Sequence, residues 1–324
     1  MKPFEYTRLE NAQDFAFIEN GKFLGGGTNL IDLMKLQIET PDALVDVTRA
    51  GMDTIREEDG TIVIGSQVSN TDLAAHPIIR KNYRVLSEAL LSGATQQLRN
   101  KATTGGNLLQ RTRCQYFYDT ARACNKREPG SGCDALEGIN RFHAILGASE
   151  NCIAVHPSDM AVAMVALDAA VLTRQTGSER RIPVADLHRL PGDRPELDHV
   201  LDDGELIVAV ELPASPPSLQ AYRKVRDRSS YAFAVVSAAV ALDIEKGKMR
   251  NVRIGLGGVA HKPWRASKAE AVLEGAVPDI ATFVQAMERE MVDATGHGHN
   301  DFKISLAPRV VVSMLKELTG LGEN

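Results

Sequence analysis

The stretch KFLGGGTNLIDLMK, residues 22–35, places three consecutive glycines between an apolar approach and a run of helical character. Gly25, Gly26 and Gly27 can adopt backbone angles that other residues avoid, and they let a ligand approach the main chain. Free N–H groups in such a turn form an anion-binding concavity, to which a following helix adds its positive end. The pattern matches neither GxGxxG nor the P-loop, so it predicts a strand, a turn and a helix that either bind an anion or form only a tight turn.

The composition is that of a globular chain with room for two or three domains. Its 324 residues include 44% hydrophobic ones, enough for sizeable cores. The net charge of −5 argues against a general nucleic-acid binder. The N-terminus, MKPFEYTRLE, lacks the apolar segment of a signal peptide, and the longest apolar stretch, residues 231–242, is too short to span a bilayer. We therefore expect no signal peptide, no membrane insertion and no nucleic-acid partner.

Strand-like and helix-like segments are intermixed in the first half of the chain. Residues 43–50 and 60–68 are expected to form strands separated by an acidic turn, and residues 70–94 a single helix. A second glycine turn, TTGGNLLQ, occupies residues 103–110. Residues 156–174 then predict a capped helix that leads into a strand.

The second half contains the expected domain boundary. Residues 201–215 predict a turn and a strand, and the proline-rich stretch 213–218 is the best linker candidate. Beyond it, residues 231–244 and 250–258 predict an antiparallel hairpin. Helical patterns follow near residues 265–274, 278–293 and 306–319. The predicted class is therefore α+β, with a boundary near residues 215–220.

All four cysteines fall in one polar segment with little periodicity, at Cys114, Cys124, Cys133 and Cys152. A chain with a large apolar core hardly needs structural disulfides. A zinc site usually contains a short Cys-x₂₋₄-Cys pair, and none is present. Long, irregular spacing suits four thiolates around a cubic iron–sulfur cluster. The spacing favours the cluster and leaves zinc, disulfides and free thiols as alternatives.

Basic residues are concentrated just before and within this cysteine segment. Between residues 98 and 127 they face a single acidic residue, Asp119. They are Arg99, Lys101, Arg111, Arg113, Arg122, Lys126 and Arg127. Such a cationic collar is expected to stabilise cluster thiolates or attract an acidic redox partner or a pyrophosphate, unless it is simply a solvated basic loop.

Six segments in this order resemble the FAD-binding medium subunit of the xanthine dehydrogenase and aldehyde oxidase family of molybdenum hydroxylases. They are GGGTNLIDL, TTGGNLLQ, HPSDMAVAMVALDA, GELIVAVELP, YRKVRDRSSYAFAVVS and IGLGGVAHKPWR. The resemblance covers residues 3 to 320. The cysteine segment looks like that of the flavin subunit of periplasmic aldehyde oxidoreductases, whose insert binds a [4Fe–4S] cluster. The flavin subunit of 4-hydroxybenzoyl-CoA reductase, which also has a cluster, is the alternative within this family.

This resemblance implies two domains. Residues 1–216 would form a two-lobed FAD-binding domain of the vanillyl-alcohol oxidase type, with a cysteine-rich [4Fe–4S] insert at about 111–153. Residues 217–324 would form a smaller α+β C-terminal domain of the CO dehydrogenase flavoprotein type. The single Trp264 is expected to anchor a core rather than touch flavin.

The resemblance also implies the residues that bind each cofactor. The FAD pyrophosphate would be cradled by Leu24, Gly25, Gly26, Gly27, Thr28, Asn29, Leu30, Ile31 and Asp32. The second phosphate and ribityl turn would be Thr103, Thr104, Gly105, Gly106 and Asn107. The sugar or diphosphate would contact Ser158 and Asp159, the adenine or flavin would contact Leu206 and Ile207, and Lys224 would reach the polar edge of the flavin. The cluster would be held by Cys114, Cys124, Cys133 and Cys152.

The implied function is electron transfer, with no catalytic residue on this chain. The expected partners are a molybdenum-cofactor large subunit and a [2Fe–2S] small subunit in a heterotrimer, with ferredoxin, a quinone or oxygen as acceptor. The complex would be periplasmic through a signal on the small subunit, or cytoplasmic. We expect non-covalent FAD, because neither glycine turn has a neighbouring histidine or cysteine in the sequence. The alternative from another class is a zinc-stapled scaffold without enzymatic activity.

Overall fold

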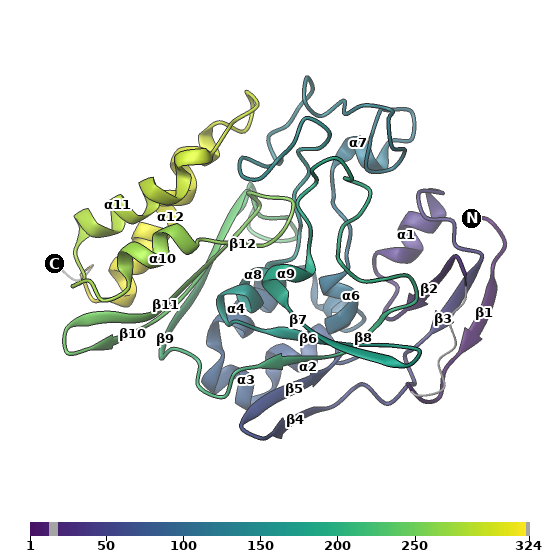
Figure 1. The fold of residues 1–324 in the computed structure, drawn as a ribbon, viewed down its shortest axis with the longest axis horizontal. Helices are drawn as coiled ribbons and strands as arrows, with labels where there is room; N and C mark the ends of the chain where they lie inside the picture. Colours follow the sequence, from purple (N-terminus) through teal and green to yellow (C-terminus); the bar gives the residue numbers. More distant parts are fainter. Residues whose placement is uncertain (13–18, 322–324) are drawn as a thin grey trace.

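A small parallel sheet carries the first glycine turn in the computed structural model, which describes residues 1–12 and 19–321. Its strands lie in the order β1 (Glu5–Arg8), β3 (Ala43–Asp46), β2 (Gly21–Leu24). The turn after β2 leads into α1 (Leu30–Lys35), on the N-terminal side of Figure 1. The strand, turn and helix predicted from the glycines are therefore present.

An antiparallel sheet of five strands forms the base of the second lobe (Figure 1). Its order is β4 (Ile55–Glu58), β5 (Thr61–Gly65), β8 (Leu206–Leu212), β6 (Ala170–Gln175), β7 (Ser178–Pro183). The central strand β8 is mostly buried, as its sequence LIVAVEL requires. The expectation of only an acidic turn between residues 50 and 60 was wrong, because β4 lies there. Its charged residues suit an exposed edge strand, where they discourage pairing with another chain.

Three helices replace the single helix expected over residues 70–94. They are α2 (Asn70–Ala75), α3 (Pro77–Asn82) and α4 (Arg84–Ser92). Pro77 disfavours helical angles at the preceding residue, and His76 is extended, with φ −60° and ψ 130°. Tyr83, with φ −126° and ψ 49°, makes the second break. The apolar periodicity continues across both breaks, which is why it resembled one helix.

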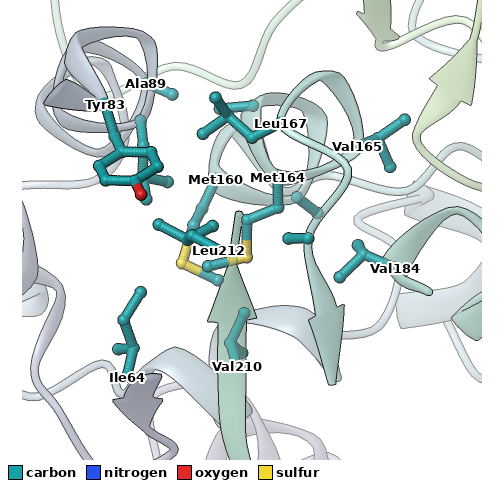
Figure 2. Packing of buried hydrophobic residues seen from close by; sticks show 14 of the residues in the cluster. Ile64, Tyr83, Ala89, Met160, Met164, Val165, Leu167, Val184, Val210 and Leu212 are labelled. Atoms are coloured by element: carbon teal, nitrogen blue, oxygen red, sulfur yellow. The ribbon is translucent and has the colours of Figure 1, made fainter. Parts of the chain in front are cut away.

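Helix α8 (Asp159–Ala166) lies at the centre of the molecule, and all eight of its residues are buried. Ser158 caps it, as expected, by accepting a hydrogen bond from the N–H of Ala161 at 2.9 Å. Met160 and Met164 pack among residues of the five-stranded sheet and of the α3–α4 junction, including Ile64, Leu212 and Tyr83 (Figure 2).

The C-terminal domain is a four-stranded antiparallel sheet covered by helices. Its order is β12 (Trp264–Arg265), β11 (Lys248–Gly257), β10 (Val236–Glu245), β9 (Leu219–Val225). The predicted hairpin is β10–β11, and its turn uses Lys246 and Gly247, both at positive φ. The helical segments are α10 (Ser267–Leu273), α11 (Ile280–Glu290), the 3₁₀ helix η1 (Met291–Asp293) and α12 (Phe302–Leu318). The fold is thus α+β, as predicted.

Helix α8 also contacts the four-stranded C-terminal sheet, and two glycines of β11 allow the close approach. A Cβ on Gly255 would lie 2.5 Å from the Val162 carbonyl oxygen, and one on Gly257 would lie 2.6 Å from Cγ2 of Val162. Both distances are shorter than real side-chain contacts, so only glycine permits β11 to lie this close to α8. One short helix therefore belongs to the core between the two domains.

The cysteine segment is irregular and lies at one end of the molecule, near α7 in Figure 1. The remaining helices of the described residues are α5 (Gln96–Arg99), α6 (Thr104–Leu108), α7 (Gln115–Tyr118) and α9 (Val184–Leu187), each of four or five residues. Trp264 donates from Nε1 to Glu290 at 2.8 Å and packs on the C-terminal core. Among the described residues, no helix combines the length and apolarity that a bilayer crossing needs.

Candidate functional site

A cavity of about 1120 Å³ lies between the two glycine turns and extends to the C-terminal sheet. Of the predicted FAD residues, it is lined by Leu24, Gly25, Gly26, Gly27, Thr28, Asn29, Leu30, Asp32, Thr103, Gly105, Gly106, Asn107, Ser158, Asp159, Leu206, Ile207 and Lys224. Ile31 and Thr104 do not line it. The structure thus brings together side chains that are spread over 200 positions of the sequence.

The first turn is held against the second by contact between their main chains. A Cβ on Gly26 would lie 1.7 Å from the carbonyl oxygen of Lys101, so no other residue fits at this position. Gly27 has φ +73°, and a Cβ there would approach Cγ1 of Ile31 at 3.0 Å. Ile31 therefore packs behind the turn. Asn29 accepts a hydrogen bond from the N–H of Arg111 at 2.9 Å, which ties the turn to the cysteine segment.

The second turn begins helix α6 and is capped by its own side chains. Thr103 caps the helix by accepting from the N–H of Gly106 at 3.2 Å. Thr104 is fully buried and donates from its hydroxyl to the Val68 carbonyl at 3.0 Å. It therefore supports the turn from behind instead of facing the cavity.

Two buried histidines support the end of α6. His156 and His188 each place Nε2 against the carbonyl oxygen of Leu108, at 3.2 and 2.7 Å, with ring centroids 4.2 Å apart. Burial lowers the pKa of His188 to about 4 and that of His156 well below its ordinary value. Both rings are therefore neutral at pH 7 and donate one hydrogen bond each to a carbonyl that the helix leaves unpaired.

A chain of hydrogen bonds connects the second turn to helix α8. The hydroxyl of Ser158 donates to Oδ1 of Asn107 at 2.6 Å while it caps α8. Gln110 donates to the same oxygen at 2.7 Å. Ser158 is thus both a helix cap and a cavity-lining group.

Lys224 reaches the cavity as an ion pair. Its Nζ lies 2.8 Å from Oδ2 of Asp159, and both side chains are nearly buried, 3% and 9% exposed. Tyr222 donates to the other oxygen of Asp159 at 2.5 Å, and burial next to that carboxylate raises the pKa of Tyr222 well above its usual value. The positive charge of Lys224 is therefore compensated within the protein.

Two members of the cationic collar form ion pairs within the fold, and one of them, Lys126, also lines the small cavity of the four cysteines. There its charge favours the thiolate of Cys152, against the rise in pKa that burial causes. Lys126 and Arg111 point inward to Asp198, at 2.5 and 2.7 Å, and Arg111 also pairs with Glu39 at 2.6 Å. Burial alone would raise the pKa of Asp198, but the two cations hold it well below its usual value. The members of this charge network come from distant parts of the chain, so the sequence alone did not show that they pair.

Two further collar residues, Arg99 and Arg113, line the large cavity, and Arg113 is the one that lies beside the first glycine turn and the cysteine segment. Its guanidinium lies 5.2 Å from the centre of the Phe233 ring, and no ion pair of the described residues includes it. Burial lowers its pKa, and the nearby carboxylate of Asp32, which makes no ion pair with it, offsets this only in part. An anionic ligand group would supply a compensating charge, and the sequence alone did not distinguish Arg113 from its neighbours.

The four cysteines gather around a second, much smaller cavity of about 10 Å³. All four are free thiols. Burial raises the pKa of Cys114 to about 12 and that of Cys152 to about 11. Within the part of the chain that the structure describes, no group of His, Cys, Asp or Glu side chains is arranged to hold a single metal ion. The set of four thiols that line this cavity suits a thiolate-bound cluster.

Histidines and a cysteine do line the large cavity, although none neighbours a glycine turn in the sequence. They are Cys114, His143, His156 and His199. The absence of such residues next to the glycine turns in the sequence therefore does not extend to the folded cavity, and non-covalent FAD remains a prediction.

Two family models match the chain. Residues 3–215 match the FAD binding domain in molybdopterin dehydrogenase, and residues 220–318 match the CO dehydrogenase flavoprotein C-terminal domain. The aldehyde oxidoreductase FAD-binding subunit PaoB of Escherichia coli is 51% identical over 98% of both chains. The carbon monoxide dehydrogenase medium chain of Afipia carboxidovorans is 27% identical over 94% of this chain and 92% of its own. The reconstituted CO dehydrogenase from Oligotropha carboxidovorans has a chain of the same fold, with a TM-score of 0.76, 23% identity and 98% coverage of both chains.

Proposed function

The chain belongs to the family of FAD-binding medium subunits of the molybdenum hydroxylases, and we propose on this basis that it is the electron-transfer subunit of an aldehyde oxidoreductase. The identity of 51% with a subunit of that description, over 98% of both chains, supports aldehydes as the substrate class of the complex. The observation that carries the role of this chain is the cavity lined by both glycine turns. Its position between three sheets leaves room for an extended dinucleotide.

The residues that line the cavity divide into groups that suit the parts of FAD. The turn from Leu24 to Asp32 would hold the pyrophosphate through main-chain N–H groups, and Arg113 would supply a compensating cation. Asn107 and Ser158 would bond ribityl or sugar hydroxyls. Leu206 and Ile207 would pack on a ring. When bound, FAD supplies the exchange of one or two electrons.

A charge-reversal test examines the pyrophosphate assignment. Thr28 is half-buried and lines the cavity, and its side chain makes no hydrogen bond to the part of the chain that the structure describes. Thr28→Glu adds a carboxylate beside the proposed phosphates, and Thr28→Gln adds the same bulk without charge. We expect the Glu variant to bind FAD about tenfold or more weakly than the Gln variant. Equal flavin affinity of the two variants, measured by fluorescence titration, would contradict the assignment.

We further propose that Cys114, Cys124, Cys133 and Cys152 hold one [4Fe–4S] cluster. The support is that these four thiols, spread over 39 positions of the sequence, line one cavity. Metal binding displaces the thiol protons, in competition with the raised pKa values of Cys114 and Cys152. Anaerobic preparation and analysis for iron, sulfide and zinc tests this. Stoichiometric zinc without iron would overturn it in favour of a zinc-stapled loop.

The electron route requires partners that the chain itself does not contain. We propose a heterotrimer with a molybdenum-cofactor large subunit, which oxidises the aldehyde, and a [2Fe–2S] small subunit, which delivers electrons to this chain. Ferredoxin, a quinone or oxygen would then accept them. The chain purified alone should leave aldehydes unchanged and still reduce an artificial acceptor from chemically reduced flavin. Aldehyde turnover by the single chain, at the rate of the complex, would refute this role.

A further inference from the structure

The two cavities share one wall, formed by Thr112 and Cys114, which line both of them. Among the described residues, Cys114 is the one cysteine of the four that lies on this wall. The hydroxyl of Thr112 accepts from the N–H of Cys114 at 3.2 Å and fixes the main chain there. A change in the position of the Cys114 side chain would therefore alter the lining of both cavities.

His143 lies against this sulfur from the side of the large cavity. Its Nε2 is 3.1 Å from Sγ of Cys114, and the side chain is nearly buried, with 5% of the residue exposed. Nδ1 of the same ring is buried and has no hydrogen-bond partner among the described residues. A proton on Nδ1 would be an unpaired buried donor, whereas a proton on Nε2 points at sulfur. The favoured neutral tautomer therefore donates to Cys114.

The main chain of His143 is held by residues at the start of α12. Nζ of Lys303 donates to the carbonyl oxygens of His143 and Gly258, at 2.9 and 2.8 Å. Nδ2 of Asn300 donates to the carbonyl of Ala144 at 2.9 Å. Lys303 and Asn300 are both fully buried. The C-terminal domain thus fixes the place from which the imidazole reaches the cysteine segment.

We propose that His143 is a positioning residue for Cys114, whose sulfur it holds by a hydrogen bond from Nε2–H on the wall between the two cavities. This inference rests on the proposed iron–sulfur cluster. An extra electron on a cluster increases the negative charge on its sulfur ligands, so a donor to one of them favours the reduced form. His143 would therefore raise the reduction potential of the cluster as well as fix the position of its ligand.

Two substitutions at one position separate the hydrogen bond from the bulk of the ring. His143→Leu removes the donor and keeps an apolar side chain of moderate size, whereas His143→Gln keeps an N–H. The full-length parent chain and both variants are prepared anaerobically, analysed for iron and sulfide, and titrated with dithionite under electron paramagnetic resonance. We expect the Leu variant to bind the added electron about tenfold more weakly, which is about 59 mV for a one-electron couple. The Gln variant should lie close to the parent.

Each outcome decides between the alternatives. A lowered potential, or loss of the cluster, in the Leu variant together with recovery in the Gln variant supports the proposal. Unchanged potentials in both variants, equal shifts in both, or loss of iron from both while the parent retains it would overturn the role of the hydrogen bond. A parent chain without iron would instead refute the proposed cluster, so the two failures are distinguished by the metal analysis of the parent.

Discussion

Replacing His188 with glutamine should make the protein less sensitive to acid. In the native chain His188 is buried and donates to the Leu108 carbonyl at the end of α6, next to the second glycine turn. Burial lowers its pKa to about 4, against an ordinary value of 6.5. The folded protein therefore resists taking a proton that the unfolded chain accepts readily. Glutamine retains an N–H for the carbonyl and does not titrate.

The difference between the two pKa values gives the sign and size of the change in the free energy of unfolding with pH. The contribution of His188 is complete above pH 6.5 and is lost as the pH falls toward 4, because over that window the unfolded state binds more protons. Each pH unit within this window corresponds to about 1.4 kcal/mol. Between pH 6.5 and 4, the free energy of unfolding of the parent should therefore fall by about 3 kcal/mol more than that of the variant. His156 and His261, also buried with lowered pKa values, remain in both proteins and keep part of the slope.

Urea unfolding of the flavin-free chain measures the effect, since bound flavin would add its own stabilisation. Midpoints are taken at pH 7.0, 6.0, 5.0 and 4.5 by far-ultraviolet circular dichroism. Replacement of the exposed His299 by glutamine serves as the control and should follow the parent. Parallel pH profiles for the parent and the His188 variant would refute the argument that a buried neutral histidine supports this turn.

Asp198→Asn should lower the free energy of unfolding by about 3–5 kcal/mol, because it leaves the buried Lys126 without a carboxylate and leaves Arg111 with Glu39 alone. The matched change Asp227→Asn, at an exposed pair, should cost about 0–1 kcal/mol in the same urea titration, and equal costs would contradict the buried network. Gly26→Ala should reduce both folded yield and flavin content, because its Cβ would meet the Lys101 carbonyl; a normal yield with normal flavin would show that the two turns are not held in contact. Acid precipitation should release all of the flavin into the supernatant, whereas colour in the pellet would indicate a covalent link to one of the cysteine or histidine side chains that line the cavity.

Local signals made much of the fold predictable. The glycine turns, the cap at Ser158 and the hairpin at Lys246 and Gly247 each depend on neighbouring residues, and each is present. The division of the predicted helix at Pro77 was missed because apolar spacing continues across it. Strand β4 was missed because an edge strand can be almost wholly charged.

The residues of the site were predictable from the sequence only where they are neighbours in one short segment. Thr104 and Ile31 belong to the right segments but face away, and the direction of a side chain within a short turn is not evident from spacing. The Asp198 network could not be predicted, since Arg111 and Asp198 are 87 positions apart. The pairing of His143 with Cys114 likewise depends on tertiary contacts that no motif records.

The burial of α8 between the five-stranded and the four-stranded sheet limits which homologous segments this protein can exchange during evolution. A chain cut near residue 216 would expose the face of α8 that now lies against Gly255 and Gly257, and Asp159, which lines the large cavity, is at the start of that helix. Either half exchanged for a homologous half would have to match the other at Val162 to within the size of one methyl group. Recombination at this boundary should therefore yield insoluble chimeras unless α8 and β11 are inherited together.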